Sequence, residues 1–242
     1  MKRHVQVLLL VLTGLGLLHA ALFSDLYLRY VKEGLRPVLI ASGVLLLLLG
    51  MAGAALDRAE PEDHGHAHGH DHSTVPRIAW LLFLPALSLL LHAPPALGAY
   101  TAARANNKAV QKEQRFDPLP ATTPVPMTLT DFTARVQQDP EQAIKGRNVR
   151  MTGFVTPAGQ GAGWYLTRII FTCCAADSQS VKVRMYGTPV LPANTWVAVT
   201  GTWHPRGTLG TKSATAALDI HRTERINPPV NAYTDDLPLT PS

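Results

Sequence analysis

Charged residues, aromatic residues and cysteines are all scarce in this chain of 242 residues. Asp, Glu, Lys and Arg together make up 16% of it, and Phe, Trp and Tyr make up 7%. The net charge is +5, but the basic residues are scattered and form no dense run. Nucleic-acid binding usually needs a basic patch and, for single strands, a platform of aromatic side chains. We therefore expect no nucleic-acid partner.

The chain has only two cysteines, Cys173 and Cys174, and they are adjacent. This arrangement excludes the framework of disulfides that staples many small secreted domains. Two neighbouring thiols can instead ligate a metal, form a strained vicinal disulfide, or serve as small structural residues. No histidine stands near them in the sequence to act as a base, so we expect neither a catalytic thiol nor an enzyme.

Long apolar runs, in contrast, are abundant in the first hundred residues. They cover residues 5–23, 38–56 and 78–98. Each is close to the roughly 20 residues that a helix needs to cross a lipid bilayer. The first run is longer than the core of a signal peptide, and no A-x-A cleavage site closes it. Residues 1–100 are therefore predicted to be a multi-pass transmembrane region with three helical spans.

The distribution of basic residues gives conflicting signals about orientation. The short N-terminus with Lys2 and Arg3 favours a cytoplasmic start, which places the chain outside after three crossings. Basic residues are more numerous on the other side of the spans, which favours the reverse. Because long domains translocate largely regardless of charge, we expect the C-terminal domain to be extracytoplasmic.

The loop 57–77, between the second and third runs, has the composition of a metal-binding tract. Five of the ten histidines alternate there with Gly, Ala or Asp. Neutral imidazole suits zinc, copper and nickel, and small spacers let several rings meet one ion. Exchangeable binding of a divalent metal, zinc first, is predicted at His64, His66, His68, His70 and His72. A solvated polar connector is the alternative.

The composition changes sharply after the third run. Residues 101–127 are polar and then Pro-rich, which is typical of a stiff, extended linker. Residues 128–230 have the composition of one soluble domain, and residues 231–242 are predicted to be a tail. The domain is expected to open with a helix that is capped by Thr130 or Asp131.

Alternating apolar residues then predict five short strands. These cover residues 147–156, 164–172, 181–186, 196–203 and 214–222. Turn signals separate the strands, and Gly201 suits a tight bend in the fourth of them. Five short strands after one helix predict an all-β, OB-like five-stranded barrel.

The cysteine pair stands at the end of the second strand. Neighbouring side chains of a strand point to opposite faces, so both thiols can meet one ion only if the chain bends. The following Ala-Ala-Asp stretch can provide that bend. Cys173, Cys174 and the carboxylate of Asp177 would then converge on a soft or borderline metal. Alternatively, one cysteine is buried as a small apolar residue while the other is exposed.

The hexad 172–177 resembles the signature of the YcgQ-type bacterial membrane protein family. Further similarities are the His-rich tract between spans, Pro94-Pro95, and the phrases at 145–155 and 227–233. The resemblance covers nearly the whole chain. It implies a subunit of a two-component permease in the bacterial cell membrane, a separate multi-span permease as partner, and a link to zinc homeostasis. The chain departs from the family pattern at Ser178-Gln179, where relatives have Ala and Pro.

Taken with the resemblance, these patterns predict an accessory subunit of a membrane permease complex that handles a divalent metal. Zinc or another divalent transition metal would be held by the five histidines and by the cysteine group. Two alternatives stay open. One is a membrane-tethered protein-interaction module with structural cysteines, and the other is a thiol-redox membrane protein.

Overall fold

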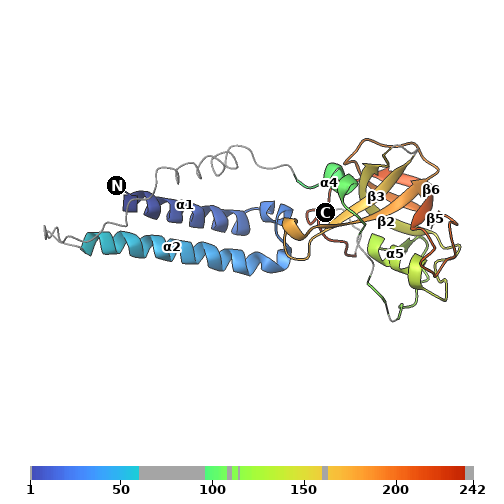
Figure 1. Cartoon of the computed structure of the whole chain (residues 1–242), viewed down its shortest axis with the longest axis horizontal. Helices are drawn as coiled ribbons and strands as arrows, with labels where there is room; N and C mark the ends of the chain where they lie inside the picture. Colours follow the sequence, from blue (N-terminus) through green and yellow to red (C-terminus); the bar gives the residue numbers. More distant parts are fainter. Residues whose placement is uncertain (1, 60–95, 108–110, 114, 160–162, 238–242) are drawn as a thin grey trace. The chain divides into compact units, whose positions relative to one another are not determined.

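The chain divides into two structural units (Figure 1). The computed structural model describes residues 2–59, 96–107, 111–113, 115–159 and 163–237. The first unit combines Met1–Leu18 with Ala41–Ala96, and the second combines His19–Ile40 with Leu97–Ser242.

Two apolar helices, α1 (Lys2–Leu22) and α2 (Arg36–Ala59), form at the first two predicted runs. Both are long and apolar enough to cross a membrane. Within the first unit they approach closely, because a Cβ atom on Gly14 would lie 2.8 Å from the carbonyl oxygen of Gly43. Such small residues are typical of helix contacts in membranes. The third predicted run, 78–98, lies almost wholly outside the described residues.

The connection between α1 and α2 is compact. It contains the 3₁₀ turns η1 (Leu26–Arg29) and η2 (Glu33–Leu35). Tyr27 is buried, and Arg36 donates from Nε to the carbonyl of Ala21 at 2.8 Å. The connection therefore has a defined shape that it can present to the rest of its unit.

A five-stranded β-barrel is the centre of the second unit. Its strands are β2 (Val149–Pro157), β3 (Trp164–Ile170), β4 (Gln179–Tyr186), β5 (Trp196–Trp203) and β6 (Ala217–Arg225). The sheet order is β1-β2-β3-β4-β6-β5, and a further pairing of β2 with β5 closes the barrel. All five predicted strands are present, although β6 starts at Ala217 and not at 214. The short strand β1 (Val125–Pro126), parallel to β2, was not predicted.

Two glycines allow the strands to curve around the core. A Cβ atom on Gly153 in β2 would lie 2.6 Å from the carbonyl oxygen of Thr167. On β5, the pairing register with β6 shifts between Thr200 and Gly201. Glycine is common at such bulges and close approaches, so the bend that the sequence predicted at Gly201 is present.

Helix α5 (Leu129–Gln138) packs on the barrel through Phe132 and Val136, which belong to its buried core. The predicted caps of this helix, Thr130 and Asp131, are wrong. Thr128 is the N-cap, and its hydroxyl accepts a hydrogen bond from the Asp131 amide at 3.0 Å. The Thr130 hydroxyl instead donates to Asp235, a contact between distant parts of the chain that a local pattern cannot show.

Parts of the predicted linker and tail also pack against the barrel. Helix α4 (Ala99–Arg104) buries Ala99 and Ala102 in a cluster with Phe154. Val125 and Met127 are buried in the main core, and Tyr233 is buried beyond the predicted end of the domain. Residues of the predicted linker and of the predicted tail thus contribute to the packing of the second unit.

Candidate functional site

The cysteine pair lies in the loop that follows β3. The loop is anchored by Phe171, which is buried and stacks on Tyr233 with ring centroids 4.4 Å apart. The amide of Phe171 also donates to the carbonyl of Tyr233 at 3.1 Å. Beyond this anchor the chain leaves the sheet, so Cys173 is exposed and Cys174 is half-buried.

A short 3₁₀ turn, η4 (Ala175–Asp177), supplies the bend that the sequence predicted. Cys174 caps this turn reciprocally, because its side chain accepts from the Asp177 amide while the Asp177 carboxylate accepts from the Cys174 amide. The same carboxylate accepts from the amides of Thr172 at 3.0 Å and Cys173 at 2.7 Å. Asp177 therefore holds the loop in shape.

The carboxylate also changes the acidity of the neighbouring thiol. A hydrogen bond to Asp177, then one to Cys174, raises the pKa of Cys173 to about 11. Desolvation acts to raise the pKa of Asp177, but hydrogen bonds from Cys173, Cys174 and Thr172 outweigh it and lower that pKa. At neutral pH the pair is thus a protonated thiol beside a carboxylate.

The loop is also bound to the connection between α1 and α2, within the second unit. The Lys32 amide donates to the carbonyl of Cys173 at 3.0 Å, and the Ala175 amide donates to the carbonyl of Tyr30 at 2.8 Å. Val31 and Cys174 thereby form an isolated antiparallel bridge. The cysteine loop and this connection therefore share backbone hydrogen bonds, so a change in the shape of the loop would strain or break them.

The structure brings together the three residues that the sequence singled out. One ligand atom from each of Cys173, Cys174 and Asp177 lies within 4.8 Å of the others. Two thiolates on one tetrahedral zinc ion lie about 3.8 Å apart, since each Zn–S bond is about 2.3 Å. A closure of at most about 1 Å would therefore bring the two thiols to the separation that zinc requires. Among the described residues it is the only such group of three.

Asp177 can join such a site only after the thiol proton has left. A carboxylate has about four acceptor positions, and three amides with the Cys173 thiol use them here. Loss of the thiol proton on metal binding frees one of these positions. The five histidines of the other predicted site, 64 to 72, lie outside the described residues.

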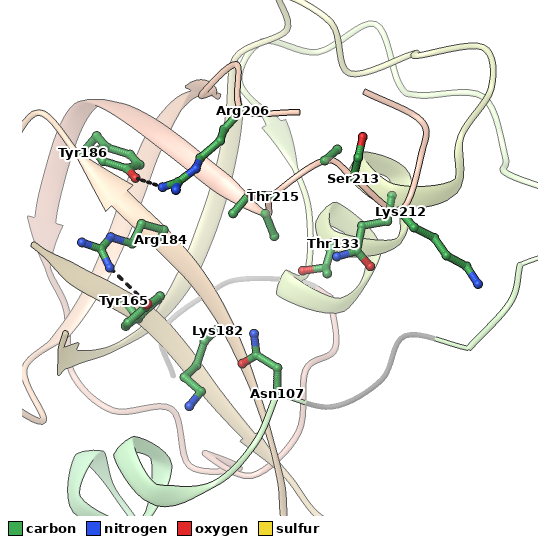
Figure 2. A pocket seen from close by; sticks show the side chains of 13 residues that line it. Asn107, Thr133, Tyr165, Lys182, Arg184, Tyr186, Arg206, Lys212, Ser213 and Thr215 are labelled. Atoms are coloured by element: carbon green, nitrogen blue, oxygen red, sulfur yellow. Dashed lines mark hydrogen bonds between the residues drawn. The ribbon is translucent and has the colours of Figure 1, made fainter. Parts of the chain in front are cut away.

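A second feature was not predicted from the sequence: a basic pocket of about 750 Å³ on the outer face of β3 and β4 (Figure 2). Lys182, Arg184 and Tyr186 alternate along β4 and line it together. The sequence shows this alternation, but a polar face on a strand is also what an ordinary solvent-exposed face looks like, so it does not by itself predict a pocket. The remaining lining residues include Tyr165 of β3 and Arg206 of the segment between β5 and β6.

Comparison with known proteins identifies the soluble part of the chain. The family model described as DUF1980 C-terminal domain matches residues 109–234, and the chain therefore belongs to this family. The match contains β1 to β6, α5 and the whole cysteine loop. No curated protein and no solved structure matches the chain.

Proposed function

We propose that this member of the DUF1980 C-terminal domain family is the accessory subunit of a bacterial membrane permease complex that handles a divalent metal, zinc first. The observation that carries the proposal is the convergence of Cys173, Cys174 and Asp177 on one exposed loop. Three protein ligands leave a position open, and an open position suits a site that receives and releases its ion. The separate multi-span permease supplies the pathway, because a few apolar spans offer little to line one.

The His-rich tract complements this site in the proposed mechanism. The tract would collect zinc through His64, His66, His68, His70 and His72. Zinc binding must order this tract, which costs conformational entropy, so the ion would be held loosely and would exchange rapidly. The cysteine group would bind more selectively, because thiolates prefer soft and borderline metals. Metal binding at the cysteine group would also affect the connection between α1 and α2, because Tyr30 and Lys32 of that connection are hydrogen-bonded to the cysteine loop.

We further propose that the membrane region has three spans. The connection between α1 and α2 contacts the cysteine loop, so both belong on one side of the bilayer. Two crossings by α1 and α2 return the chain to the side of its N-terminus. A third crossing must bring it back to the barrel, and the apolar run at 78–98 is the segment with the required composition.

We also propose that the barrel is OB-like. Support comes from the closed order β2-β3-β4-β6-β5, with β4 and β6 as a parallel pair in an otherwise antiparallel barrel. Such barrels serve as docks for ligands and partners as well as for nucleic acids, so the fold agrees with an accessory role.

One observation favours the second candidate, a membrane-tethered interaction module with structural cysteines. The reciprocal cap between Cys174 and Asp177 gives both residues a role in loop shape without a metal. The thiol-redox alternative has less support, because the raised pKa of Cys173 leaves little thiolate at neutral pH.

Isothermal titration calorimetry, in which zinc is added to the metal-free full chain in detergent, tests the proposal. Cys173→Ser with Cys174→Ser is expected to remove one class of zinc site, and replacement of the five histidines by Ser is expected to remove another. Binding at the cysteines should strengthen as pH rises, because zinc displaces the thiol proton. Unchanged zinc stoichiometry in the double cysteine variant, with an intact fold, would favour the structural role.

A further inference from the structure

The basic pocket between β3, β4 and the segment before β6 has a use that the metal proposal does not absorb. No Asp or Glu is found among the described residues that line it. Its volume, about 750 Å³, is within the range of small-molecule sites. Its charge comes from Lys182, Arg184, Arg206 and Lys212.

These four cations are not equivalent. Lys182 donates to the carbonyls of Ala102 at 2.8 Å and Ala105 at 2.7 Å, so its ammonium group is used at the end of α4, and burial lowers its pKa. Figure 2 shows the amine of Lys212 extending away from Arg184 and Arg206. Arg184 and Arg206 are therefore the two lining cations that both lie near Tyr186.

The two guanidinium groups share one aromatic neighbour, Tyr186. Arg184 donates to the hydroxyl of Tyr165 at 3.1 Å, and its guanidinium carbon lies 5.2 Å and 5.8 Å from the ring centres of Tyr165 and Tyr186. Arg206 donates to the hydroxyl of Tyr186 at 3.5 Å. The ring of His204 stacks on the ring of Tyr186, with the two ring centroids 4.1 Å apart. This contact fixes the position of Tyr186.

Two permanent positive charges near one tyrosine repel each other, and an anion bound in the pocket would reduce this repulsion. We propose that this pocket binds a phosphate group, either on a soluble phosphorylated molecule or on a lipid headgroup. Arg184 and Arg206 contribute planar forks that match phosphate oxygens, and the hydroxyls of Tyr165 and Tyr186 add donors at the rim. The pocket has room beyond one phosphate for the rest of such a ligand.

Calorimetric titration of the full chain in a maltoside detergent tests this site. The three probes are inorganic phosphate, glycerol 3-phosphate and a short-chain phosphatidylglycerol, and citrate is the comparison anion without phosphorus. Arg206→Gln and Arg184→Gln are each expected to weaken binding at least about tenfold, because each removes a charge-assisted pair. Arg206 is exposed, so its variant should keep the fold even if Arg184→Gln does not.

Arg225→Gln is the matched control, since it removes the same charge from an exposed position on β6 that does not line the pocket. Binding of the soluble phosphates alone would identify a soluble ligand, and binding of the lipid alone would identify a headgroup. Either result supports the site. It would be overturned by the absence of saturable binding for all three probes, by an equal loss in Arg225→Gln, or by tighter binding of citrate than of any phosphate.

Discussion

Asp177 determines how the thiol of Cys173 reacts. The hydrogen bond between the two groups favours the protonated thiol and raises its pKa from 9.0 to about 11. An exposed cysteine with an ordinary pKa would be open to alkylation and oxidation near neutral pH. The carboxylate therefore protects an exposed thiol from alkylation and oxidation near neutral pH.

This protection predicts a distinctive pH profile. The rate at which iodoacetamide alkylates Cys173 should rise about tenfold per pH unit up to about pH 11, whereas an ordinary thiol levels off near 9. Asp177→Asn should move the pKa back toward 9.0 and accelerate alkylation at pH 8 by up to about 100-fold. Peptide mass spectrometry separates Cys173 from Cys174.

Asp177→Glu is the matched control, because it keeps the charge. A profile that levels off near pH 9 in the unmodified chain would contradict the contact between thiol and carboxylate. Added zinc should slow alkylation at any pH in the unmodified chain if the pair ligates the ion.

Glycines at the contact between α1 and α2 allow the two helices to approach closely. Gly14 meets the backbone of Gly43 and the side chain of Leu47 on α2, whereas Gly16, two residues later, has nothing within 4 Å. A stripe of small residues thus sets how close the two helices lie, and the exposed flank does not matter for this contact.

Gly14→Leu is expected to destabilise the helical hairpin by about 1–3 kcal/mol, because the added side chain must push Gly43 away. Gly16→Leu is the control and should leave stability nearly unchanged. Thermal melting of the full chain in one detergent compares the two variants. Equal melting temperatures would show that the helices do not pack through this face.

The terminal segment is a second element that stabilises the domain. Asp235 accepts hydrogen bonds from the amides of Leu129 and Thr130 at the start of α5. It also pairs with Arg168 at 3.9 Å, and both side chains are almost fully buried. Burial lowers the pKa of Arg168, although Asp235 and Asp236 act against that shift.

Asp235→Ala would leave the Arg168 charge buried without this partner, which typically costs about 3–5 kcal/mol. The exposed neighbour gives the control, and Asp236→Ala should have a much smaller effect. Urea unfolding of the full chain, followed by fluorescence of the barrel tryptophans, measures both. A loss below about 1 kcal/mol for Asp235→Ala would contradict a structural role for the pair.

The strands could be predicted because alternation is a local signal, as at Val181, Val183 and Met185 in β4. The cap of α5 and the packing of residues beyond the predicted domain could not be predicted, because they depend on Asp235 and Tyr233, which are distant in sequence from their contacts. The cysteine loop falls between these cases. Its bend followed from local residues, whereas its contact with residues 30–32 is visible only in the folded chain.

The contact between the cysteine loop and residues 30–32 bears on the membrane topology of the whole molecule. In the proposed three-span arrangement, the connection between α1 and α2 shares one side of the membrane with the barrel, and the His-rich loop lies on the other side. If the short basic N-terminus stays in the cytoplasm, the barrel with its cysteine loop and basic pocket faces outward. The histidines would then meet metal from the cytoplasm and the cysteines would meet it from outside, as expected for a subunit that contacts both ends of a transport path.

Labelling of single cysteines in cells tests this arrangement. In a Cys173→Ser, Cys174→Ser background, a membrane-impermeant maleimide should label Leu26→Cys and Arg225→Cys in intact cells, because both positions are exposed and on the outer side. Ser73→Cys, in the loop 57–77, should react only after permeabilisation. Labelling of Ser73→Cys alone in intact cells would keep the shared side but reverse the orientation. If Leu26→Cys and Arg225→Cys react from opposite sides, the connection and the barrel are separated by the bilayer, and both the three-span topology and the contact with the cysteine loop are wrong.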